Sequence, residues 1–423
     1  VATCRLHRGQ IESLRAHPNV ASLKAPRGLV NSINAEEKLT SESLQQDVYP
    51  IVRPDVPETG RGVVIGIIDW GCDFAHPDFL DENGHTRLRA IWIQRGVSDI
   101  TERNPYGRGR IITREEINEA LSTDDPYATL GYHPGQIAPD GASHGTHVMG
   151  IAAGNGLGSG QSGIAPDAEL VFVEADSGGM SGLANFGDSV SLLEAIDFII
   201  KLVGDEPCVI NMSMGRLGGP HDGSTLVEIG MDALLKRIRN CLICNSTGNY
   251  YALEAHASGT IEPDRQRTLT WIVDPADRTP NELEVWYGGD DKFAVELISP
   301  EGMVFGPVLL GKQQNVVIDE ELVGRIYHRS SDPNNHKNHV DIFLYTNGPV
   351  GEWRLGLTGI EISDGHFDAW IERDNSNPNN QSRFAREDVD PTTTTGTIAN
   401  GRMTITVGAY DAMSPAREIA PFS

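Results

Sequence analysis

The feature that most constrains the fold is a set of short, unbroken apolar runs that recur along the chain. The first covers residues 63–68 and is bounded by Gly62 and Asp69. An unbroken run of this length fits a strand that is buried on both faces, as in a parallel sheet. Similar runs lie at residues 170–173, 208–212, 242–244 and 404–407.

Helical patterns separate these runs. Residues 144–153 are small and apolar, and apolar residues recur at helical spacing in residues 189–203 and 226–238. Strands that alternate with helices form βαβ units, so we expect an α/β fold with a doubly wound, mostly parallel sheet. A further helix is predicted at residues 113–121, because it begins with the capping-box pattern Thr-Arg-Glu-Glu.

Residues 260–398 follow a different pattern, that of short alternating strands separated by turn residues. Four of the six tryptophans of the chain lie in this region. The pattern is typical of a β-sandwich, here inserted into the α/β domain. We therefore expect an N-terminal segment (residues 1–30), a linker (31–60), a split α/β core (61–259 and 399–423) and a β-sandwich insertion (260–398).

The charge balance restricts the partners. The chain has 423 residues with 34 Lys+Arg and 59 Asp+Glu, a formal net charge of −25. Binding to nucleic acid or to an anionic membrane surface needs an excess of basic residues. No apolar run approaches the roughly 20 residues of a membrane-spanning helix. We therefore expect neither nucleic acid nor a membrane as a partner.

The five cysteines do not form a disulfide framework, because their number is odd and they are sparse. Cys241 and Cys244 lie in an apolar run, and we interpret them as core thiols rather than a redox or metal pair. No second cysteine pair or histidine cluster completes a zinc site. No dense acidic loop of the EF-hand type, which would indicate a calcium site, is present. We predict no metal and no cofactor. Free thiols and the absence of a signal-peptide pattern favour a cytoplasmic location for the protein, while secretion stays open.

Three polar residues stand where an α/β sheet gathers functional groups, beyond the carboxyl ends of strands. Asp69 is the residue that ends the first strand. An acid at this place can be a metal ligand, a phosphate acceptor or the partner of a catalytic histidine, or it can simply cap a turn or helix. His144 opens a helix of small residues. His147 follows three residues later without the glutamate of a zinc-protease helix, so we expect it to be structural. Asn249 follows a strand and suits an oxyanion, although an ordinary turn asparagine fits as well.

Together and in this order, the segments resemble the subtilisin-like serine proteases, the subtilase family. Residues 68–73 and 76–79 are similar to the catalytic-aspartate motif of the family. Residues 144–150, His-Gly-Thr-His-Val-Met-Gly, are similar to the catalytic-histidine motif, with Met149 in place of the usual alanine. Residues 209–215 are similar to the substrate-binding strand, 247–249 to the oxyanion-asparagine motif, and 11–23 to the end of an inhibitory propeptide. Residues 403–411 and 420–423 are similar to the segment shortly before the catalytic-serine helix of the family. The 113–121 helix and the β-rich insertion resemble the Csp-type bacterial subtilases, whose insert is a jelly roll.

The resemblance implies a serine endopeptidase that acts through an acyl-enzyme. Asp69 would orient His144, which would act first as general base and then as general acid. Asn249 would hydrogen-bond the oxyanion, an interaction worth about 2.7–4 kcal/mol in subtilisin. A protein or peptide substrate would pair with the backbone of Ser213, Met214 and Gly215. Its other side would be flanked by Glu174, Asp176 and Gly178, and the two acids would favour basic substrate residues.

The departure from the family concerns the nucleophile. The family carries it in a Gly-Thr-Ser-Met-Ala motif, and this sequence contains no Gly-Thr-Ser. We do not expect Ser423, Ser213 or Ser246 to be the nucleophile. A thiolate nucleophile at Cys72 would need His144 close by and a lowered thiol pKa. We expect the serine to be supplied by a segment that is not in this chain, as a further or separately processed piece of an autoprocessed zymogen. Two alternatives stay open: an inactive pseudoprotease that binds or regulates a protein, and an unrelated α/β function.

Overall fold

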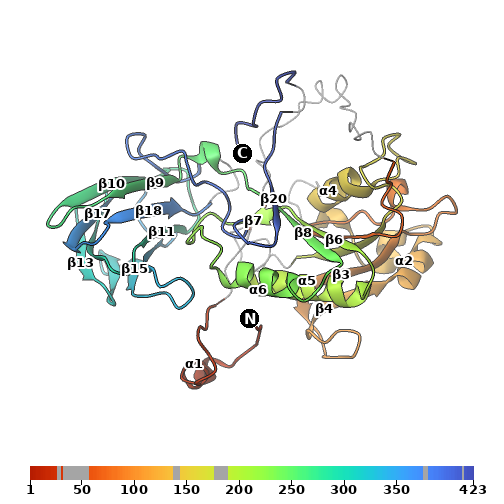
Figure 1. The fold of residues 1–423 in the computed structure, drawn as a ribbon, viewed down its shortest axis with the longest axis horizontal. Helices are drawn as coiled ribbons and strands as arrows, with labels where there is room; N and C mark the ends of the chain where they lie inside the picture. The colour runs from red at the N-terminus through yellow and green to blue at the C-terminus, as the bar shows by residue number, and fades with distance from the viewer. Residues whose placement is uncertain (26–29, 32–56, 137–142, 176–188, 375–379, 412–413) are drawn as a thin grey trace.

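The central sheet of the molecule has seven strands, six of them parallel (Figure 1). The computed structural model describes residues 1–25, 30–31, 57–136, 143–175, 189–374, 380–411 and 414–423. The order across the sheet is β20 (Ile405–Val407), β8 (Cys241–Ser246), β6 (Cys208–Met212), β2 (Val64–Asp69), β5 (Glu169–Glu174), β3 (Leu88–Val97) and β4 (Arg108–Thr113). Only β4 runs antiparallel to its neighbour. The predicted α/β class is confirmed.

Helices cover both faces of this sheet, which explains why its central strands read as unbroken apolar runs. All six residues of β2 are buried. On one face, α5 (Ser189–Val203) and α6 (Leu226–Leu235) pack against Ile68 and Ile210. On the other face, α4 (His144–Ala153) and α2 (Arg114–Leu121) pack against Ile65 and Ile67. The capping box predicted for α2 forms, with Thr113 as the N-cap residue.

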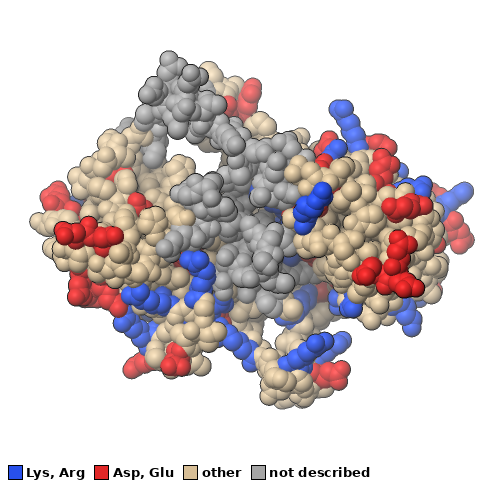
Figure 2. All heavy atoms as spheres, turned by 180° about the vertical axis from the view of Figure 1, so that it is seen from behind, with Lys and Arg blue, Asp and Glu red and all other residues tan. Residues whose placement is uncertain are grey.

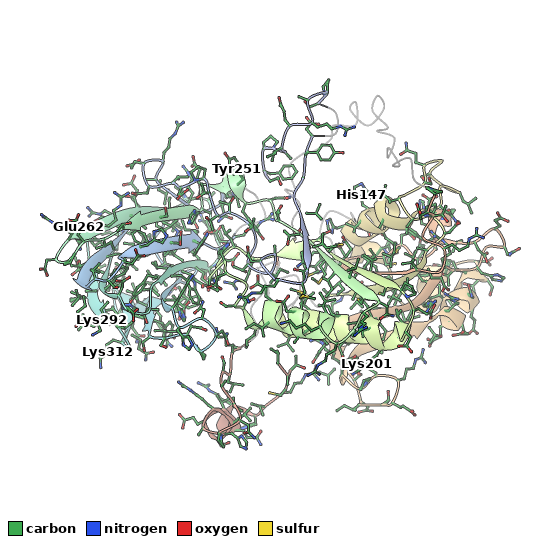
Figure 3. All side chains as sticks on the ribbon, viewed as in Figure 1. His147, Lys201, Tyr251, Glu262, Lys292 and Lys312 are labelled. Carbon is green, nitrogen blue, oxygen red and sulfur yellow. The ribbon has the colours of Figure 1, made fainter. Side chains whose placement is uncertain are left out.

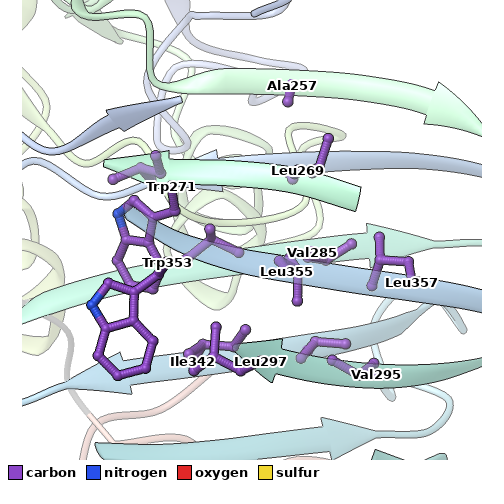
Figure 4. Close-up of a cluster of buried hydrophobic side chains, with 14 of the residues drawn as sticks. Ala257, Leu269, Trp271, Val285, Val295, Leu297, Ile342, Trp353, Leu355 and Leu357 are labelled. Carbon is purple, nitrogen blue, oxygen red and sulfur yellow. The ribbon is translucent and has the colours of Figure 1, made fainter. Parts of the chain in front are cut away.

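The insertion consists of two antiparallel sheets that share one apolar core. The five-stranded sheet has the order β13 (Val304–Leu309), β12 (Lys292–Ile298), β17 (Gly351–Glu361), β10 (Gln266–Val273) and β19 (Arg383–Phe384). The six-stranded sheet has the order β14 (Gln313–Ile318), β15 (Glu321–Arg329), β16 (Asn338–Leu344), β11 (Asn281–Tyr287), β18 (His366–Ile371) and β9 (His256–Thr260). Trp271, Trp353 and Leu355 meet Val285 and Ile342 of the facing sheet (Figure 4).

The chain enters and leaves the insertion beside the central sheet. β8 precedes it and β20 follows it, and the two strands are parallel neighbours. The insertion includes β9, so its first strand begins at His256, slightly before the boundary expected from the sequence. Short helices α1 (Ile11–Arg15) and α3 (Pro126–Leu130) complete the described α-helices. On the face seen in Figure 2, acidic and basic side chains are interspersed.

A fourth, two-stranded sheet joins segments that are far apart in the sequence. β1 (Val30–Asn31) pairs antiparallel with β7 (Met214–Gly215), with Val30 opposite Gly215 and Asn31 opposite Met214. No helix in the described ranges has the length and apolarity needed to cross a bilayer.

Candidate active site

The centre of the candidate site is a hydrogen-bonded pair formed by Asp69 and His144. Asp69 is the last residue of β2 and is completely buried, and His144 is the first residue of α4 with a side chain that is 10% exposed. The Oδ1 atom of Asp69 bonds Nδ1 of the His144 ring and also accepts the Trp70 amide at 2.7 Å. Burial raises the pKa of Asp69, and the neighbouring imidazole opposes that rise.

The turn after β2 is locked to the first turn of α4, which fixes the imidazole. The Gly145 amide donates to the Trp70 carbonyl at 2.6 Å, and the Ser143 hydroxyl donates to the Gly71 carbonyl at 2.7 Å. Gly145 has no room for a side chain, because a Cβ there would lie 2.6 Å from the Phe172 ring. The pair is therefore held by packed backbone rather than by side chains alone, as preorganised catalysis requires.

The other ring nitrogen of His144, Nε2, is available for proton transfer. No hydrogen bond of Nε2 to a described residue is present, while Nδ1 is fixed by the carboxylate of Asp69. A histidine held in this way has one nitrogen fixed by an acid and the other free to accept a proton from a nucleophile. His147, the second histidine of the motif, lies exposed on the outer side of α4 (Figure 3).

Asn249 lies just beyond the end of β8, at the same edge of the sheet as Asp69. It follows Gly248, which has a φ of +92° and no space for a Cβ beside the Tyr250 ring. Thr247 is held on both sides, by its amide to the Val407 carbonyl at 3.0 Å and by its carbonyl to the Gly396 amide. The Asn249 amide is half-buried and has no hydrogen bond to another described residue, so it is free to donate to a ligand.

The predicted substrate strand lies beside the same sheet edge. Ser213 is half-buried and accepts a hydrogen bond from the Asn211 amide at 3.1 Å, and Met214 and Gly215 are buried in β7. The partner of β7 is β1, from the N-terminal segment. This pairing is not predictable from the sequence pattern, because a two-residue strand leaves no periodic signal. The resemblance of residues 11–23 to a propeptide end is the one sequence feature that points to it.

The acids expected to flank the other side of a bound peptide are less well placed to contact a substrate. Glu174, the last residue of β5, is completely buried, and its carboxylate pairs with Arg95 at 2.8 Å. This geometry does not favour Glu174 as a contact for a basic substrate residue, because its charge is already balanced inside the protein. Asp176 and Gly178 lie outside the described residues.

Neither Cys72 nor Ser423 takes the position of a nucleophile. Cys72 is completely buried, and burial raises the pKa of its thiol well above the usual range, so the reactive thiolate is disfavoured. The Ser423 hydroxyl accepts a hydrogen bond from the Ala409 amide at 2.8 Å.

One group of acids within the described ranges comes close enough to be considered as a cation site. It consists of Glu282, Glu284 and Asp341 in the insertion, whose nearest oxygens lie within 4.8 Å of one another. Arg216 pairs with both glutamates and Arg329 pairs with Asp341, so basic side chains already balance part of this charge. The group gives no support for a metal cofactor.

Comparisons with known proteins agree with the geometry. A family model described as the subtilase family matches residues 60–276, about half of the chain. Subtilisin-like protease SBT2.1 of Arabidopsis thaliana is 34% identical over 206 residues, covering 45% of this chain and 23% of that protein. Subtilisin E of Bacillus subtilis is 26% identical over 238 residues, covering 55% of this chain and 45% of that protein. The chain thus spans less than half the length of these curated relatives.

The solved structure of the Clostridium perfringens CspB protease has the same fold. It aligns with a TM-score of 0.71 and 24% identity, over 86% of this chain and 73% of that one. The alignment extends beyond the region matched by the family model, so it includes most of the β-rich insertion. The structural similarity to this protease supports the fold of the chain.

Proposed function

The chain belongs to the subtilase family, and we propose that it carries part of the catalytic machinery of a serine endopeptidase. The observation that carries the proposal is the buried Asp69–His144 hydrogen bond, which leaves Nε2 of His144 without a described partner. Asp69 holds the ring and stabilises its protonated form. His144 takes the proton of a serine hydroxyl as that oxygen attacks the peptide carbonyl, and returns it to the leaving amine.

Asn249 and the β7 edge complete the proposed machinery. The Asn249 amide donates to the oxyanion of the tetrahedral intermediate, which its freedom from described partners supports. An extended peptide adds to the edge formed by Ser213, Met214 and Gly215 and is held by backbone hydrogen bonds. The antiparallel pairing of β1 with this edge supports the proposal, because it demonstrates that an extended segment fits there.

We infer that the nucleophilic serine lies on a segment outside this sequence that covers an open part of the central sheet. Leu242, Ile405 and Val407 are 50%, 45% and 55% exposed. The pairing of Ile405 with Cys244 puts all three on one face of the sheet, and β-sheet register connects this face to the side where α4 covers β2. A segment that buries these side chains would lie beside α4 and could bring a serine to His144.

The N-terminal residues support an inhibitory role before processing. β1 occupies the edge that a substrate would use, with Val30 opposite Gly215 and Asn31 opposite Met214. We propose that the protein is made as a zymogen and cleaves itself after β1, within residues 32–56. This cleavage would release or loosen the segment that occupies the substrate edge.

The test uses a longer protein that includes the proposed serine-bearing segment. A fluorophosphonate probe should label one serine in that protein, and N-terminal sequencing should find a new terminus within residues 32–56. His144→Ala should abolish both results while the protein stays folded by circular dichroism. A folded longer protein that takes no label would refute the protease and favour an inactive binding module. Continued processing in the His144→Ala variant would point to an outside protease.

A further inference from the structure

Arg216 connects the substrate edge directly to the insertion. It follows Gly215, the last residue of β7, and its side chain is only 8% exposed. The guanidinium contacts three carboxylates of the insertion. Nη2 lies 3.2 Å from both Glu282 and Glu284 of β11, and Nε lies 2.9 Å from Glu372, the residue after β18.

The main chain of the same segment is held from the insertion as well. The carboxylate of Glu372 accepts the amides of Leu217 and Gly218, each at 3.0 Å. The Arg216 carbonyl accepts the Thr397 amide at 2.9 Å. The Arg216 side chain and the backbone of residues 216–218, which follow β7, are therefore both held by the insertion and the segment after it.

The partners of Arg216 are themselves rigid. Glu284 is completely buried on β11 and accepts the Trp286 indole N–H at 2.9 Å. β11 lies in the middle of the six-stranded sheet, between β16 and β18. A planar guanidinium held by several carboxylates has little freedom to rotate, so the geometry of the insertion is transmitted to the first residue after the edge.

We propose that Arg216 is a positioning residue through which the insertion sets the backbone of Ser213–Gly215 for pairing with a peptide. The role rests on the proposed protease function and gives the insertion a part in substrate binding. Arg216 does not touch the reacting atoms; it acts through the edge. Backbone pairing depends on where the edge N–H and C=O groups point, so a displaced edge weakens binding of extended peptides before it affects His144.

The structural test is hydrogen exchange on this chain, which needs no catalysis. Glu372→Gln removes the charge that holds Arg216 and the two amides, and Arg216→Lys keeps the positive charge but loses the planar contacts. In both variants, exchange at the amides of residues 213–215, none of which Glu372 contacts, should become about tenfold faster or more.

The matched control is Lys292→Gln, which removes an exposed ion pair with Glu361 on the outside of the same insertion (Figure 3). It should leave exchange at the edge unchanged. Unchanged exchange at residues 213–215 in folded Glu372→Gln or Arg216→Lys protein would overturn the proposal. If the glutamine variant does not fold, the lysine variant decides.

A kinetic test separates this proposal from the protease assignment. In the longer protein, Arg216→Lys should raise KM for a peptide that spans the edge about tenfold and leave kcat within a factor of about two, as loss of uniform binding predicts. A lower kcat with unchanged KM would contradict the positioning role. Failure of the wild-type protein to take the fluorophosphonate label would instead refute the proposed function, and hydrogen exchange would still decide the role of Arg216.

Discussion

His221 should make the stability of the protein depend on pH. Its ring is buried against the Trp370 indole, with ring centroids 4.1 Å apart, and Nε2–H donates to the Leu217 carbonyl at 2.6 Å. Nδ1 is buried and has no hydrogen-bond partner among the described residues. A proton on Nδ1 would therefore place an uncompensated N–H in the interface between core and insertion. Burial accordingly lowers the pKa of His221 to about 4.

The size and sign of the effect follow from linkage. The unfolded chain binds a proton at His221 with a pKa of about 6.5, and the folded state does so only near pH 4, so stability is lost as pH falls below about 6.5. The predicted loss in the free energy of unfolding is about 1.4 kcal/mol at pH 5.5 and about 2.6 kcal/mol at pH 4.5. The limit below both pKa values is about 3.4 kcal/mol.

Other groups titrate in the same range with the opposite sign. Burial raises the pKa of Glu228 and of Asp374 to about 7, so the folded state holds these protons more tightly than the unfolded chain. Their stabilisation is greatest at low pH and is lost as pH rises toward 7 and beyond. The wild-type curve is therefore a sum of opposing slopes, and a difference between variants is needed to isolate His221.

The assay is urea unfolding of wild type and His221→Asn from pH 8 to pH 4.5. Asparagine tolerates the left-handed backbone of this position, where φ is +48°. The stability of wild type relative to the variant should fall by about 2.5 kcal/mol over this range. The control is His336→Asn, an exposed histidine with a φ of +60°. A flat difference curve for His221→Asn, or an equal slope for the control, would refute the reasoning.

Three further predictions concern the site. Gly145→Ala should destabilise the fold by about 1–3 kcal/mol in urea unfolding, because its Cβ would meet Phe172; Gly150→Ala on the same helix, with nothing within 4 Å, should stabilise it by about 0.5–1 kcal/mol. In the longer protein, Asn249→Ala should lower kcat by about 10²–10³-fold with little change in KM. Asp69→Asn should lower kcat by about 10⁴-fold in the same steady-state assay, because the amide stabilises the wrong tautomer of the histidine.

The core of the fold could be predicted because its signals are local. Each unbroken apolar run became a strand of the central sheet, and the helix expected at 144–153 has those bounds in the structure. The place of Asp69 could be expected, because a parallel sheet brings functional groups together beyond the carboxyl ends of its strands. Its pairing with His144 was expected only from the resemblance to the subtilase family.

Some strands of the insertion carry no such local signal. β15 carries Gly324 in its interior, and β13 contains Gly306 and Pro307, residues that normally argue against a strand. The Arg216 cluster was also invisible, because Glu284 is 68 residues away in sequence and a single arginine after a strand has no periodicity. Contacts of this kind are specified by tertiary packing alone.

The position of the insertion has a consequence for how the chain folds. β8 and β20 are adjacent strands, yet the paired residues Cys244 and Ile405 are separated by 161 positions. Closing a flexible loop of that length costs about 4.5 kcal/mol of chain entropy, whereas a loop of about 20 residues costs about 2.7 kcal/mol. An insertion that folds first holds its own ends near each other and so shortens the loop that β20 must close. We expect β20 to join the sheet late, after the sandwich has formed, which would make the insertion an internal folding aid for the central sheet.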